Sequence, residues 1–132
     1  MKFEELCDAR YSLRKFDSRP VEAEKLQKVL EAGRKAPTAH NLQPQRFFVM
    51  QSEEALAKAD TCTACHFHPP VVIVAAYDPE IAWKREEDGK NHGEIDVTLA
   101  VSQMICRQQN WDWEQRMLVC LIQKNCWSSS QR

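Results

Sequence analysis

Two guanidinium side chains and a hydroxyl occupy alternate positions near the start of the chain, at Arg10, Ser12 and Arg14. In extended backbone, side chains two positions apart point the same way, so these three groups are expected to share a face. Guanidinium groups bind phosphate through paired, charge-assisted hydrogen bonds, and a hydroxyl adds a further donor. The spacing therefore indicates a phosphate cradle, and a solvated basic strand is the alternative.

A second polar segment lies between two prolines, Pro37 and Pro44. It contains the hydroxyl of Thr38 and the amides of Asn41 and Gln43. Short hydroxyl and amide side chains offer hydrogen-bond donors and acceptors to a planar heterocycle. The segment is therefore a candidate ligand loop, and a polar turn between a helix and a strand is the alternative.

A third motif, Cys62-Thr63-Ala64-Cys65-His66, matches the spacing at which haem is attached covalently. The absence of an export signal and the position just before a buried strand both disfavour haem. The two cysteines with His66 or His68 could also bind a metal, but a closed zinc site needs four ligands. We interpret the motif as a chance pairing in a loop. The other histidines, His40 and His92, lie in polar loops and are predicted to be solvated.

These segments must be positioned by helices and strands, which the apolar pattern predicts. Helices are expected over residues 3–10, 21–35 and 53–60 and from residue 93 onward, and strands over residues 47–50 and 71–76. The run from Val71 to Ala76 is continuously apolar, as in a strand that is buried on both faces. Helices that alternate with short strands predict the α+β fold class.

Composition narrows the possible functions. The chain has 132 residues, 43% of them hydrophobic, which fits one folded domain. A net charge of -1 argues against nucleic acid or an anionic membrane as the main partner. The longest apolar run is too short to cross a bilayer, and the first ten residues contain no signal segment. We therefore expect a cytoplasmic protein that needs neither membrane nor nucleic acid.

The order of the first two segments along the chain strengthens their interpretation as ligand-binding segments. Arg-x-Ser-x-Arg, a helix, Ala-Pro-Thr-Ala-x-Asn-x-Gln-Pro and a strand together resemble the nitroreductase family of flavoproteins. The resemblance covers roughly residues 6–104 and implies a nitroreductase-like α+β fold that is incomplete at its C-terminus.

The resemblance implies FMN as cofactor, in two sites at the interface of an intertwined homodimer. The basic segment would lie at the FMN phosphate and pyrimidine end, and the proline-bounded loop would contact flavin from the partner subunit. The residues concerned are Arg10, Ser12, Arg14, Pro37, Thr38, Asn41 and Gln43. The implied reaction transfers hydride from NAD(P)H through flavin to a nitroaromatic or quinone-like acceptor, and no side chain is assigned as acid, base or nucleophile. A cofactor-free, non-enzymatic fragment and a haem or metal redox module at Cys62, Cys65 and His66 remain the alternatives.

The last part of the chain departs from the family pattern. Family members continue the final helix into a segment like Leu-Gln-Ala-Ala-Glu-Leu-Gly-Leu-Gly-Thr, whereas this chain has an unrelated sequence after Cys106. Regrouping the codons of Asn110 to Glu114 from the last base of the Asn codon gives Leu-Gly-Leu-Gly for every codon choice. One base lost near Ile105 or Cys106 would produce this shift.

The codon argument divides the chain into two parts. Residues 1–105 are expected to form a partial nitroreductase-like domain, and residues 106–132 an out-of-frame tail that is foreign to the fold. The family's C-terminal strand and its contacts near the flavin phosphate would then be missing. The cysteines and tryptophans that concentrate in this tail would have no functional role.

Overall fold

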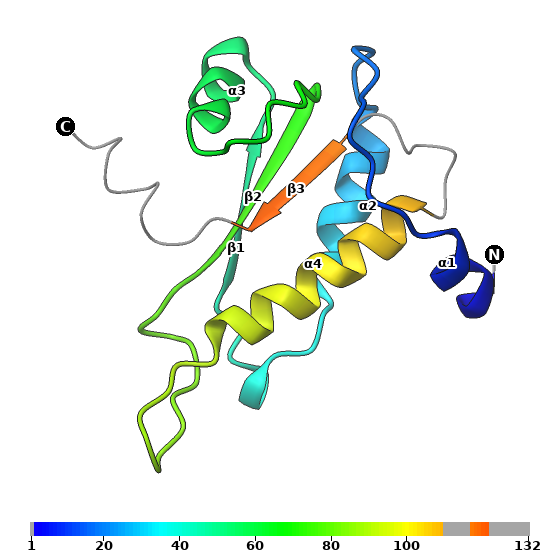
Figure 1. Cartoon of the computed structure of the whole chain (residues 1–132). Helices are drawn as coiled ribbons and strands as arrows, with labels where there is room; N and C mark the ends of the chain where they lie inside the picture. Colours follow the sequence, from blue (N-terminus) through cyan, green and yellow to red (C-terminus); the bar gives the residue numbers. More distant parts are fainter. Residues whose placement is uncertain (1, 110–116, 122–132) are drawn as a thin grey trace.

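The computed structural model describes residues 2–109 and 117–121, which form a small sheet packed against helices (Figure 1). The sheet has the strand order β1-β2-β3. Strand β1 (Gln45–Met50) runs antiparallel to β2 (Val71–Tyr77), and β3 (Met117–Leu121) runs parallel to β2. Strand β2 is therefore the central strand, which explains why its sequence is apolar without alternation.

Helices α2 (Ala23–Arg34) and α4 (Gly93–Gln109) pack against each other beside the sheet (Figure 1). Helix α3 (Glu53–Asp60) contacts β1 and β2, and α1 (Phe3–Ala9) contacts α4. The shortest element is the 3-10 turn η1 (Ala39–Asn41), which lies between α2 and β1.

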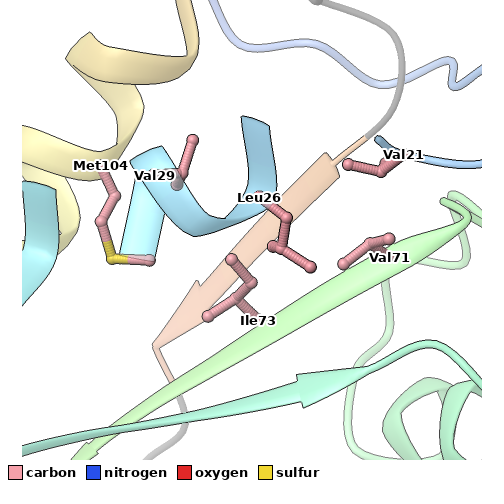
Figure 2. Close-up of a cluster of buried hydrophobic side chains, with 6 residues drawn as sticks. All are labelled: Val21, Leu26, Val29, Val71, Ile73 and Met104. Atoms are coloured by element: carbon pink, nitrogen blue, oxygen red, sulfur yellow. The ribbon is translucent and has the colours of Figure 1, made fainter. Parts of the chain in front are cut away.

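The core forms where α2 and α4 meet the middle strand. Figure 2 shows Leu26 and Val29 of α2 near Ile73 of β2, with Met104 of α4 beside them. Val29, Ile73 and Met104 are completely buried. Burying one such side chain stabilises the fold by about 1.5–3 kcal/mol, so this cluster fixes α4 relative to the sheet. The spacing of Leu26, Val29 and Gly33 puts one face of α2 on this core, as the periodicity predicts.

Gly33 permits the close approach of the two long helices. A Cβ atom at this position would lie 2.7 Å from Met104 Sδ and 2.9 Å from Phe47 Cζ. Because no side chain larger than hydrogen fits there without a shift, the glycine sets the separation of α2 and α4. The position of α4 matters because both of its ends lie near candidate site segments.

The predicted elements are confirmed within a few residues. Helix α3 has the predicted bounds, and α2 and β2 differ from the predicted ranges by two residues or fewer at each end. Within the described ranges, no helix combines the length and apolar character needed to cross a membrane.

The region expected to be foreign to the fold is partly structured. Helix α4 continues through Gln109, past the predicted boundary at residue 105, and Met117–Leu121 pairs with β2 as a third strand. The sequence Met-Leu-Val-Cys-Leu is apolar and suited to a strand, and β2 offers it an unpaired edge. The regrouped codons of Asn110 to Glu114 lie outside the described residues, so the reading-frame hypothesis stays a prediction.

Candidate functional site

The basic segment leaves α1 in the extended conformation that the sequence predicts. Arg10 has φ -68° and ψ 121°, and residues 10–22 contain neither helix nor strand. Arg10, Ser12 and Arg14 are all exposed, and Arg14 Nη1 donates to the Ser12 carbonyl oxygen over 3.4 Å. Within the described part of the chain, no acidic side chain pairs with either guanidinium, whereas Arg19, for example, pairs with Asp17. Both cations are therefore available to an anion from solution.

The proline-bounded loop is folded by its own hydrogen bonds. The Asn41 amide donates to the Thr38 carbonyl oxygen over 2.9 Å, and the Gln43 amide donates to Thr38 Oγ1 over 3.0 Å. The hydroxyl that the sequence assigns to ligand binding therefore also closes the loop. Pro37, Asn41 and Gln43 are exposed and Thr38 is half-buried, so the loop presents two side-chain amides to solvent.

Three residues of this loop have left-handed backbone. The φ angles are 52° at His40, 55° at Asn41 and 52° at Gln43. Asparagine and histidine adopt this region more readily than most residue types, whereas at glutamine the Cβ atom makes it cost roughly 1–2 kcal/mol. Such strain persists only where the surroundings enforce it, and it is concentrated at binding and catalytic sites. The backbone geometry is therefore an independent reason to regard the loop as functional.

A buried carboxylate from a distant part of the chain anchors the loop. Asp96, in the first turn of α4, is 2% exposed, and its Oδ1 accepts a hydrogen bond from the Ala39 amide over 2.9 Å. A hydrogen bond to a charged group is worth about 1.5–3 kcal/mol, enough to offset the strain of one or two left-handed residues. The N-terminus of α4 adds a favourable dipole. Sequence reasoning missed Asp96, because an acidic residue in a first helical turn is ordinary.

An aromatic row lies beside the same loop. The His40 ring stacks on Trp83 with centroids 5.3 Å apart, and Trp83 contacts the His92 ring at 4.7 Å in a tilted arrangement. The prediction that His92 is solvated is wrong. Its side chain is half-buried, and its carbonyl oxygen accepts the Ile95 amide at the start of α4. His40 is exposed, as predicted, but one face of its ring is covered.

The two candidate segments lie at opposite ends of α4. The loop is bonded to the first turn of this helix through Asp96, and α1, which leads into Arg10, lies by the other end in Figure 1. Helix α4 has 17 residues, which corresponds to a length of about 25 Å. One copy of the chain therefore does not bring the basic segment and the loop together.

The cysteine motif lines a separate cavity. A cavity of about 560 Å³ lies between α3 and the segment before β2, with Leu56, Cys62, Cys65, His68 and Val72 among its lining residues. Cys65 is a free thiol, and His66 Nδ1 lies 2.8 Å from Asp60 Oδ2. In residues 2–109 and 117–121, no three His, Cys, Asp or Glu side chains are grouped so that they could hold a metal ion. The described structure therefore gives no preformed ligand set for the haem or metal alternative.

Comparison with known proteins gives concordant matches. The model of the nitroreductase family matches residues 8–67, which include both candidate segments. The Streptococcus pyogenes serotype M6 protein named "Putative NAD(P)H nitroreductase Spy0809" is 42% identical over 59 residues. That match covers 44% of this chain and 30% of the relative.

Solved structures extend the likeness over about four fifths of the chain. The crystal structure of a nitroreductase family protein from Clostridium difficile 630 matches with a TM-score of 0.80 and 38% identity, over 83% of this chain and 63% of that one. A protein from Desulfovibrio desulfuricans, solved in complex with FMN, matches with a TM-score of 0.71 and 24% identity. It covers 81% of this chain and 62% of the other. The chain thus spans less than two thirds of the length of these relatives and has the nitroreductase-like α+β fold.

Proposed function

We propose that the chain is an FMN-dependent oxidoreductase of nitroreductase type, which transfers hydride from NAD(P)H to a nitroaromatic or quinone-like acceptor. The name of the Streptococcus pyogenes relative and the FMN complex of the Desulfovibrio desulfuricans protein support this assignment. The observation that carries it is the strained, anchored loop with exposed amides at one end of α4, opposite the basic segment at the other end.

The chemistry of the basic segment fits the phosphate of FMN. Arg10 and Arg14 are exposed cations with no acidic partner in the described residues, and Ser12 lies between them in the sequence. A phosphate would gain charge-assisted hydrogen bonds there without breaking an existing ion pair. The proposed role of these three residues is to hold the phosphate and the pyrimidine end.

The loop fits the flavin ring. The exposed amides of Asn41 and Gln43 can each donate and accept, which matches a heterocycle edge that alternates carbonyl and N–H groups. Pro37 and Thr38 complete the contact surface. When bound, FMN supplies the hydride chemistry, and the side chains supply position and charge, so none of them needs to act as acid or base.

The proposal includes a homodimer, because one chain separates the two halves of the site. A two-fold related copy with its α4 antiparallel would place the loop of one subunit next to the basic segment of the other. Two apolar side chains on α4, Ile95 and Leu99, are 48% and 43% exposed and lie one turn apart. Leu42 in the loop is 41% exposed. This apolar surface is suited to burial against a partner.

Flavin titration and absorbance spectroscopy of the purified protein test the proposal. Wild-type protein should bind FMN and show the visible flavin bands, and Arg10→Ala or Arg14→Ala should weaken binding at least about tenfold. Lys15→Ala, an exposed neighbour that also loses one positive charge, is the matched control. Titration curves unchanged in both arginine variants would contradict the phosphate assignment. A chain without flavin would favour the cofactor-free alternative, and a Soret band would favour haem.

Sedimentation tests the dimer separately. The protein loaded with FMN should sediment as a dimer, because each site needs residues from both copies. A strictly monomeric protein that holds one FMN per chain would contradict the shared site. Ile95→Glu, on the exposed face of α4, should weaken association and flavin retention together.

A further inference from the structure

Asp96 connects the loop to α4 across a large sequence separation. It lies 57 positions after Ala39, and the bond between Asp96 Oδ1 and the Ala39 amide is 2.9 Å long. Ala39 directly precedes the two consecutive left-handed residues His40 and Asn41. The Gln43 amide bonds to Thr38 Oγ1 inside the loop, whereas the Gln43 carbonyl oxygen accepts from Arg46 Nη1 of β1 over 3.2 Å and the Pro44 carbonyl oxygen accepts from the Asp78 amide over 2.9 Å.

Core packing does not explain why the Asp96 carboxylate is buried. Burying a charge is costly unless it is fully paired, and Asp96 Oδ2 has no hydrogen-bond partner among the described residues. Buried polar groups that the fold does not fully satisfy are retained most often where function requires them. Within the described part of the chain, the hydrogen bond that the Asp96 side chain accepts comes from the backbone of the candidate flavin loop.

We propose that Asp96 is a positioning residue, which fixes the Ala39 amide and thereby holds Asn41 and Gln43 in the geometry that binds flavin. The effect of Asp96 on flavin binding rests on the proposed function, whereas the hydrogen bond between Asp96 and the Ala39 amide does not. Because Asp96 is part of α4, it also fixes the loop relative to the helix whose other end lies by the basic segment. The anchor therefore sets the spacing between the two halves of the site.

Trp83 makes a second contact to the loop, at His40, the residue that follows Ala39. Its indole covers one face of the His40 ring at a centroid distance of 5.3 Å. This contact restrains a side chain, whereas Asp96 restrains the backbone through a directional bond. Loss of the Trp83 contact should therefore be tolerated better than loss of the carboxylate.

FMN titration of two Asp96 variants tests the proposal. Asp96→Ala should raise the FMN dissociation constant by about tenfold, because the loop is no longer preorganised. Asp96→Asn retains an oxygen that can accept the Ala39 amide, so its dissociation constant should stay within about threefold of wild type. Glu94→Ala, an exposed carboxylate in the same helical turn, controls for the lost charge and should leave binding unchanged. Equal dissociation constants for wild type and Asp96→Ala would overturn the proposal.

Hydrogen exchange at the Ala39 amide gives a readout that needs no flavin. In wild-type protein without FMN, this amide should exchange more slowly than the His40 amide, and Asp96→Ala should accelerate its exchange about tenfold. Asp96→Asn should restore most of the protection. If wild-type protein binds no FMN but Ala39 is protected, the proposed function fails and the anchor stands. If the Ala39 amide of folded wild-type protein exchanges as fast as an unstructured amide, the anchor is refuted, whether or not any variant folds.

Discussion

Gln43 allows the backbone strain of the loop to be separated from its ligand contacts. Its φ of 52° is left-handed, and its side chain is exposed. Gln43→Ala and Gln43→Gly both remove the amide expected to contact flavin, and both keep the backbone N–H that donates to Thr38 Oγ1. The two variants differ only in whether a Cβ atom is present. Any difference in stability between them therefore reports the cost of Cβ at this φ angle.

The expected difference in stability between the alanine and glycine variants has the opposite sign to that seen in a regular helix or strand. Alanine normally stabilises regular backbone over glycine by roughly 0.5–1 kcal/mol, because glycine is more flexible in the unfolded chain. Left-handed backbone reverses this, because a Cβ atom there costs roughly 1–2 kcal/mol. We therefore expect Gln43→Gly to be more stable than Gln43→Ala by about 1 kcal/mol, which corresponds to roughly 2–8 °C in Tm.

Thermal or denaturant unfolding without FMN measures this difference, and FMN titration measures the contact. Gln27, an exposed glutamine inside α2, is the matched control, and there Ala should be more stable than Gly by about 1 kcal/mol. Both Gln43 variants should bind FMN more weakly than wild type. If Gln43→Ala is as stable as Gln43→Gly or more so, the loop is not left-handed at this position in solution. If both variants keep full FMN affinity, Gln43 is not a flavin contact, although the strain argument survives.

Three further predictions concern the helices, the charged loop and the tail. Gly33→Ala should lower the unfolding free energy by about 1–2 kcal/mol in denaturant titration, because overpacking against Met104 outweighs the gain in helix propensity; a stability gain would contradict the close crossing. Arg85 hydrogen-bonds Asp88 and lowers the pKa of that carboxyl from 3.8 to about 2, so its stabilising effect is complete above pH 3.8 and is lost as pH falls through about 2. In Arg85→Ala, NMR titration should show the pKa of Asp88 raised toward its ordinary value, with the Lys90 amide still holding it somewhat lower, and an unchanged pKa would exclude the pairing with Arg85. Restoring one base near the codon of Ile105 should raise both Tm and FMN occupancy, and equal values in the two proteins would show that residues 106–132 are a genuine functional end.

The helices, strands and loop boundaries could be predicted because their signals are local. Apolar spacing identifies the buried face of α2, and the continuous apolar run identifies β2 as a central strand. The prolines at the two ends of the candidate loop mark where α2 must stop and β1 can begin. These signals depend only on neighbouring residues, so they do not require knowledge of the tertiary fold.

The internal structure of the candidate site could not be predicted in the same way. The left-handed backbone at Gln43 has no sequence signature, because glutamine does not favour that region. The role of Asp96 depends on the N-terminus of α4 lying beside a loop 57 positions away, which only tertiary packing can produce. The contact between Trp83 and His92 likewise depends on how the chain returns to α4.

The two ends of α4 have different neighbours, which bears on how a shifted reading frame would act. The first turn is fixed by Asp96 and lies far from the predicted boundary at residue 105. The last turn directly follows that boundary and lies by α1, a helix with no buried residue, in which Phe3 is 75% exposed. Segments with little buried surface have low local stability. We therefore expect altered sequence after residue 105 to weaken the phosphate end of the proposed site, while the loop at the other end keeps its conformation.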